Sequence, residues 1–172
     1  SPSYALEIQD PYYGEKLDGL LRHNSFKLAG YINGIDTDYW NPSQDQYLDI
    51  HYDEKSLDKK SELKTQLQEQ VGLPVRDVPL LAMVSRLVEA KGLDLINYIT
   101  DELMQDDVQI VILGTGDHQY EEALHYFAWR YPDKFHFINA YNEAEAHLIY
   151  AAADLYLMPS FYEPCGISQL IA

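Results

Sequence analysis

The sequence predicts an α/β domain with a Rossmann-like, doubly wound parallel sheet. From residue 80 onward, four short apolar runs alternate with longer amphipathic segments, and this order of strands and helices is typical of a parallel sheet. Each run is apolar at nearly every position, as in strands that are covered by helices on both faces. With 172 residues, 47% of them hydrophobic, the chain can bury such a core without disulfides or metal ions.

Residues 1–45 contain one turn signal after another, among them Asp10-Pro11, Asn33-Gly34 and Asn41-Pro42. We expect a loop-rich lead-in and interdomain segment here, with one short strand at residues 27–32.

The Rossmann-like domain is predicted to cover residues 46–172. It begins with a helix over residues 56–71, where leucine and valine recur at helical spacing among charges until Gly72. Four strands, each followed by a helix, come next. The predicted strands are 80–85, 108–113, 135–139 and 155–158. The predicted helices are 92–103, 118–130, 143–153 and a last one from Cys165 onward.

The chain starts with Ser1 and stops inside an apolar helical pattern, residues 168–172, that has no capping residue. We interpret it as a piece of a longer protein, in which the Rossmann-like domain is truncated at its C-terminus.

The charge balance excludes several classes of partner. The chain has 28 acidic and 12 basic residues, which gives a formal net charge of -16, so we expect no nucleic-acid and no membrane partner. A single cysteine excludes a disulfide framework and fits a reducing cytoplasm. The histidines lack metal-ligand spacing, so we expect no metal.

Ligands of such a sheet bind beyond the carboxyl ends of the strands. From residue 77 onward the only basic side chains are Arg86, Lys91, Arg130 and Lys134. The last two flank the start of a strand and therefore belong to the opposite edge. Arg86 and Lys91 lie on the ligand edge, where they suggest an anion with more than one charge, such as a diphosphate. The alternative is a pair of exposed surface charges.

The loop at residues 113–117 (LGTGD) resembles part of a dinucleotide-binding fingerprint, but Gln119 stands in place of the third glycine. We therefore expect no nicotinamide or flavin cofactor, and favour a tight turn or a close backbone approach at Gly116.

The loops after the third and fourth predicted strands contain the other candidate site residues. Cys165 lies near a predicted helix start, where a thiolate would be stabilised. No histidine can be placed beside it as a base, so we favour backbone amides that face a ligand. Glu163 would repel phosphate and is expected to meet sugar hydroxyls, or else to complement a helix dipole. Tyr141 is placed to stack on an aromatic base.

Four motifs give the chain a specific resemblance. The first is Tyr31-Ile32-Asn33-Gly34-Ile35-Asp36 with Trp40-Asn41-Pro42, the second Ser85-Arg86-Leu87 with Lys91-Gly92-Leu93, the third Tyr141-Asn142-Glu143, and the fourth EPCGISQL at 163–170. In this order, and over nearly the whole chain, the sequence resembles bacterial glycogen synthase and plant starch synthase.

The resemblance implies a retaining glucosyltransferase with two Rossmann domains, the GT-B type. Such an enzyme moves glucose from ADP-glucose to the non-reducing end of an α-1,4-glucan. The chain would form the start of its C-terminal, nucleotide-sugar-binding domain, in a bacterial cytoplasm or a plant plastid. The glucan acceptor would bind through the N-terminal domain, which this chain lacks. A non-catalytic module that binds a nucleotide or sugar phosphate is the alternative.

The resemblance also assigns roles to single residues. Arg86 and Lys91 would bind the phosphates of ADP, and Glu163 the transferred glucose. The remaining contacts would come from the amides of Cys165, Gly166 and Ser168, from Tyr141 against adenine, and from Asn33 toward the sugar or acceptor. Ile171 stands where a broader class of related transferases carries a second glutamate.

Overall fold

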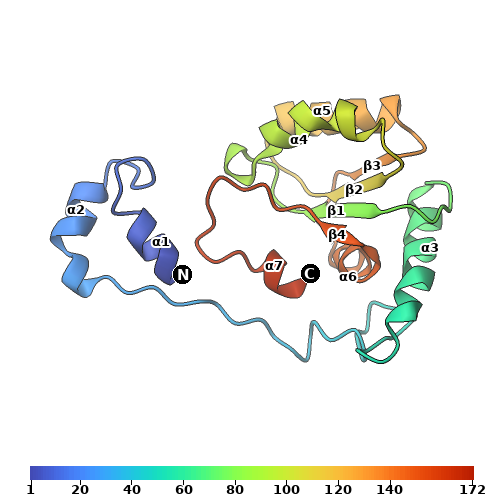
Figure 1. The fold of residues 1–172 in the computed structure, drawn as a ribbon, viewed down its shortest axis with the longest axis horizontal. Helices are drawn as coiled ribbons and strands as arrows, with labels where there is room; N and C mark the ends of the chain where they lie inside the picture. The colour runs from blue at the N-terminus through green and yellow to red at the C-terminus, as the bar shows by residue number, and fades with distance from the viewer.

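The computed structural model describes residues 1–172. One parallel sheet has the strand order β3-β2-β1-β4 (Figure 1). Its strands are β1 (Leu80–Val84), β2 (Gln109–Leu113), β3 (Phe135–Ile138) and β4 (Leu155–Tyr156). All four strands point the same way, so the loops after them meet at one edge of the sheet.

Helices cover both faces of this sheet (Figure 1). On one face lie α4 (Leu93–Leu103) and α5 (His118–Arg130), and on the other α3 (Lys60–Val71) and α6 (Glu143–Ala152). Side chains alternate along each strand, so Leu80 and Ala82 join one core, while Leu81 and Met83 join the other. The predicted doubly wound α/β fold is confirmed.

The helix predicted at 118–130 has the same bounds as α5. The strands predicted at 80–85 and 108–113 agree with the five-residue strands β1 and β2 to within one residue. Three short 3-10 turns accompany the longer helices, and η2 (Leu57–Lys59) forms the start of the helix predicted from residue 56. β4 is two residues long instead of four, because the chain leaves the sheet early to enter the loop that carries Glu163. None of the helices is long and apolar enough to cross a membrane.

The strand predicted at residues 27–32 is wrong. Lys27 ends a 3-10 turn, and residues 28–32 pair with no other strand (Figure 1). Tyr31 and Ile32 are exposed. An apolar pattern alone does not make a strand, which also needs a neighbouring strand to pair with, and none lies beside this segment. The lead-in instead contains two short helices and a 3-10 turn: α1 (Pro2–Glu7), α2 (Asp18–His23) and η1 (Ser25–Lys27).

The helix expected from Cys165 onward begins three residues later than predicted. It is α7 (Ser168–Ile171), only four residues long. Cys165 and Gly166 precede it in a loop, and Gly166 has a left-handed backbone with φ of 69°. The left-handed residue prevents the helical path from starting earlier.

Candidate functional site

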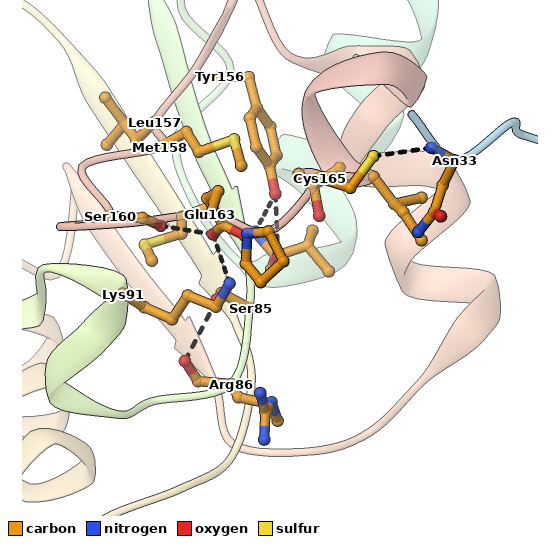
Figure 2. A pocket seen from close by; sticks show the side chains of 16 residues that line it. Asn33, Ser85, Arg86, Lys91, Tyr156, Leu157, Met158, Ser160, Glu163 and Cys165 are labelled. Atoms are coloured by element: carbon orange, nitrogen blue, oxygen red, sulfur yellow. Dashed lines mark hydrogen bonds and ion pairs between the residues drawn. The ribbon is translucent and has the colours of Figure 1, made fainter. Parts of the chain in front are cut away.

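A cavity of about 330 Å³ lies at the carboxyl ends of β1 and β4 (Figure 2). It contains every predicted site residue except Tyr141: Asn33, Arg86, Lys91, Glu163, Cys165, Gly166 and Ser168. We call it the sugar-side cavity. Residues from three of the four motifs therefore converge in space, although their separations along the chain are large.

Lys91 and Glu163 form an ion pair inside this cavity (Figure 2). Lys91 ends the 3-10 turn η3 (Glu89–Lys91), and Glu163 lies in the loop after β4. Ser160 donates its hydroxyl to the same carboxylate oxygen of Glu163 at 2.7 Å. Both charged side chains are about one-fifth exposed, so the two are partly shielded from water and hold each other in place.

Gly92 explains how these two loops come so close. It has a left-handed backbone with φ of 74°, and a Cβ atom there would lie 2.1 Å from the carbonyl oxygen of Pro159. Any side chain at position 92 would push the Glu163 loop away from Lys91. The glycine after the lysine is therefore required by packing between the loops.

Arg86 differs from Lys91 because its guanidinium makes no hydrogen bond or ion pair within the chain, and it is exposed. The other two basic side chains from residue 77 onward have partners at the opposite edge of the sheet. Arg130 pairs with Asp101, and the ammonium of Lys134 donates to the carbonyl oxygens of Met104 and Asp106. Among the four basic residues from residue 77 onward, Arg86 is thus the one that is free to bind an anion.

A second cavity of about 270 Å³ adjoins the first at the carboxyl ends of β1 and β2. We call it the base-side cavity. Its walls include Trp40, Leu113, Gly114, Thr115, Tyr141, Asn142, Glu143 and Tyr150, and it shares Val84, Ser85, Arg86 and Ser168 with the sugar-side cavity. Gly116 forms an isolated bridge with Leu87, in keeping with the close backbone approach expected there.

Tyr141 is 90% exposed on the rim of the base-side cavity, so one face of its ring is open to a ligand. Asn142 caps α6 by accepting a hydrogen bond from the amide of Glu145 at 3.2 Å. Burial raises the pKa of Tyr150 in the same cavity wall, and the Glu143 carboxylate raises the pKa of Tyr39.

A buried polar pair, which was not among the predicted site residues, supports the base-side cavity. Nδ1 of His147 lies 2.5 Å from Oδ2 of Asp45, with both side chains almost fully buried. The His147 ring stacks on Trp40 with centroids 3.9 Å apart and planes 8° apart. Asp45 and His147 are 102 residues apart in sequence, so no local pattern could have joined them. Their effect is to hold the lead-in, and with it the Trp40 wall, against α6.

We expect His147→Ala to lower the free energy of unfolding by about 3 kcal/mol, because it leaves the buried Asp45 carboxylate without the side chain that it contacts. The Nε2 atom of His147 makes no hydrogen bond, so Asp45 provides the ring's only polar contact. Urea unfolding of the 172-residue chain measures the effect. His118→Ala, at an exposed histidine of α5, is the control and should change little. Equal losses in the two variants would contradict the role of the pair.

Cys165 connects the site loop to the lead-in. Its sulfur accepts a hydrogen bond from the backbone N–H of Asn33 at 3.0 Å, and this contact is what brings Asn33 into the sugar-side cavity (Figure 2). No histidine lines that cavity. The thiol therefore has no base beside it, and its visible contact is structural.

We expect Cys165→Ser in the full-length protein to keep substantial activity, because a hydroxyl oxygen also accepts the bond from Asn33. Gly166→Val should abolish most of it, since a β-branched residue disfavours a left-handed backbone. A Cβ there would also lie 2.8 Å from the ends of the Met158 and Gln169 side chains. Steady-state kinetics with ADP-glucose, the donor that the sequence resemblance implies, compare the two. Complete inactivation by Cys165→Ser would instead indicate a chemical role for the sulfur.

Comparison with known proteins places the chain in a family. Residues 64–170 match the family described as "Glycosyl transferases group 1". The chain belongs to the group 1 glycosyl transferases. Among curated relatives, the glycogen synthase of Finegoldia magna is 53% identical and that of Clostridium acetobutylicum 51%, each over the whole of this chain. The chain spans 36% of the length of these relatives.

A solved structure agrees in fold over almost the whole chain. It is the catalytic domain of starch synthase IV from Arabidopsis thaliana bound to ADP and acarbose. The TM-score is 0.93 and the sequence identity 36%, and the matched region covers 99% of this chain and 36% of the starch synthase chain. The C-terminal domain of a group 1 glycosyl transferase (LpcC) from Francisella tularensis is 17% identical, with a TM-score of 0.52, and shows the fold alone. This transferase therefore shares the α/β architecture of the starch synthase domain.

Proposed function

We propose that the chain is the nucleotide-sugar-binding part of a glycogen or starch synthase that uses ADP-glucose. In this reaction glucose passes to the non-reducing end of an α-1,4-glucan with retention of configuration, and ADP is released. The relatives named glycogen synthase, and the starch synthase structure bound to ADP and acarbose, support the reaction. In this proposal residues 46–172 begin the C-terminal domain, and residues 1–45 lead in from an N-terminal domain that binds the glucan. We place the protein in the cytoplasm, in keeping with its bacterial relatives.

One observation carries the proposal: Arg86 lines both cavities. A nucleotide sugar has a base at one end, a sugar at the other, and a diphosphate between them. Tyr141 lies at the base-side cavity and Glu163 at the sugar-side cavity, so the free guanidinium of Arg86 stands where the diphosphate would cross. The order of chemical groups along ADP-glucose thus matches the order of side chains along the edge of the sheet.

Cleavage of the bond between glucose and diphosphate develops positive charge on the sugar carbon and negative charge on ADP. Arg86 and Lys91 would stabilise that negative charge, each by about 2 to 4 kcal/mol in the transition state. Lys91 would exchange its contact with Glu163 for the phosphate, which frees the Glu163 carboxylate to accept hydrogen bonds from glucose hydroxyls. The amides of Cys165, Gly166 and Ser168 would add contacts to glucose and phosphate.

Retention without a covalent enzyme intermediate is our proposal for the stereochemistry. Glu163 is the one carboxylate that lines the sugar-side cavity, so the cavity lacks the carboxylate pair that retaining glycosidases use. A phosphate oxygen of the departing ADP would help to deprotonate the acceptor hydroxyl. Asn33 would lie toward the sugar or acceptor, through the backbone contact with Cys165 described above.

The test is Glu163→Gln in the full-length protein. We expect glucosyl transfer to fall by about 100-fold, while the affinity for ADP changes little, because the carboxylate binds the sugar and not the nucleotide. Turnover of ADP-glucose and calorimetry with ADP measure the two effects separately. A large loss of ADP affinity with turnover spared would make Glu163 structural. Tight ADP binding by the unaltered protein with no transfer would favour a non-catalytic binding module.

A further inference from the structure

A third cavity, of about 450 Å³, lies apart from the residues used so far. It is bounded by the loop between α1 and α2, by the turn η3 and by the loop after β4. We call it the aromatic cavity. Its lining residues are Tyr12, Tyr13, Glu15, Glu89, Ala90, Phe161 and Tyr162.

The aromatic rings of this cavity are held in place but remain open to a ligand. Tyr12 packs edge-on against Tyr13, with centroids 4.8 Å apart, and Tyr162 stacks on Tyr4 at 6.3 Å. Even so, Tyr12 is 81% exposed and Phe161 49%. Large aromatic faces that stay exposed around a hollow commonly mark a binding site.

The charges in the walls restrict the class of ligand. Glu15 and Glu89 are the charged residues of the lining, and no basic side chain belongs to it. A phosphate or another anion would be repelled. A neutral sugar satisfies both kinds of wall, because its C–H faces pack on aromatic rings and its hydroxyls donate hydrogen bonds to carboxylates.

The backbone beside Glu15 is also unusual. Glu15 and Lys16 follow one another with φ of 49° and 68°, and they are the only residues other than glycine with positive φ. Such a conformation costs free energy at each residue and tends to persist where function requires it. Here it shapes the loop that carries Tyr12, Tyr13 and Glu15 to the cavity.

The aromatic cavity and the sugar-side cavity share two wall segments, the turn η3 and the loop after β4. Ala90 and Phe161 line the aromatic cavity and are joined by a hydrogen bond from the amide of Phe161 at 3.0 Å. Their near neighbours Lys91 and Glu163 line the sugar-side cavity and form its ion pair. A ligand in the aromatic cavity would therefore contact the loop that positions Glu163.

We propose that the aromatic cavity binds glucose units of an α-glucan chain, outside the donor site. This inference rests on the proposed function for the identity of the sugar, and on the cavity itself for the class of ligand. It adds a glucan contact on this chain to those expected on the N-terminal domain. The competing ligand is an organic cation, which aromatic faces and two carboxylates would also attract.

The experiment uses the ¹⁵N-labelled 172-residue chain titrated with maltoheptaose by NMR. We expect amide shifts at Glu15, Ala90 and Phe161, and a Kd raised at least fivefold by Tyr12→Ala and by Phe161→Ala. Tyr12 is largely exposed and Phe161 about half exposed, so the variants should remain folded. Tyr98→Ala is the matched control, since this tyrosine of α4 is 85% exposed and lies outside the cavity. Unchanged affinity in both test variants, or an equal loss in the control, would overturn the proposal.

Binding of maltoheptaose and of spermidine by the Glu15→Gln variant distinguishes a glucan site from a cation site. For a glucan site, the glutamine keeps a hydrogen-bond acceptor, so maltoheptaose affinity should fall by no more than threefold and exceed that of spermidine. Tighter spermidine binding that Glu15→Gln removes would overturn the proposal in favour of a cation site. The titration needs no ADP-glucose. Failure of the full-length protein to transfer glucose would therefore contradict the proposed function and leave this result standing.

Discussion

Arg86→Ala and Lys91→Ala in the full-length protein are each expected to lower kcat by about 100-fold or more, with the fold intact. In the proposed reaction these two cations would meet the diphosphate as ADP leaves. Arg86 has no partner within the chain, so its removal should leave stability unchanged and report on catalysis alone. Steady-state kinetics with ADP-glucose, together with thermal unfolding, measure both quantities.

Lys91 needs a further comparison, because its removal also leaves Glu163 without its ion-pair partner. We expect Lys91→Ala to remain costly when it is introduced into the Glu163→Gln variant, if the lysine binds phosphate. If it serves only to hold Glu163, the second substitution should add almost nothing. Arg130→Ala, at the opposite edge of the sheet, is the control. Normal ADP-glucose kinetics in both Arg86→Ala and Lys91→Ala would refute the phosphate assignment.

The parts of the fold that the sequence predicted well are those set by local pattern. The helix at 118–130 has an apolar face at helical spacing, and the run at 109–113 is apolar at every position except its first, Gln109. Each such segment has one favourable environment, buried on one face or on both. The run at 27–32 has a similar apolar pattern but no neighbouring strand, and sequence alone carries no information on that neighbour.

In the candidate site, too, features set by the local sequence could be predicted, and contacts between segments far apart in sequence could not. Arg86 and Lys91 could be placed on the ligand edge, because both follow a predicted strand. Their different surroundings could not be predicted: the ion pair of Lys91 with Glu163 depends on the contact of Gly92 with Pro159, which joins two loops far apart in sequence. The Asp45–His147 pair is hidden for the same reason.

The 172-residue chain by itself should transfer no glucose to a glucan, although it folds around its four-stranded sheet. A two-domain transferase closes a cleft over its donor, and this chain spans 36% of the length of its relatives. The loops with Arg86, Lys91 and Glu163 are present, so we expect weak binding of ADP, with a Kd on the order of millimolar. A glucan held weakly in the aromatic cavity would not change this outcome, because closure over the donor would still be missing.

Assay of the pure chain with ADP-glucose and glycogen tests this directly, by measuring released ADP against a blank without protein. The full-length protein at equal concentration is the positive control, and the Arg86→Ala chain is the control for ADP binding. We expect release at the level of the blank, together with ADP-dependent NMR shifts around Arg86 that the variant loses. Sustained, glucan-dependent release of ADP would show that the catalytic unit is complete within residues 1–172 and that the domain division proposed above is wrong.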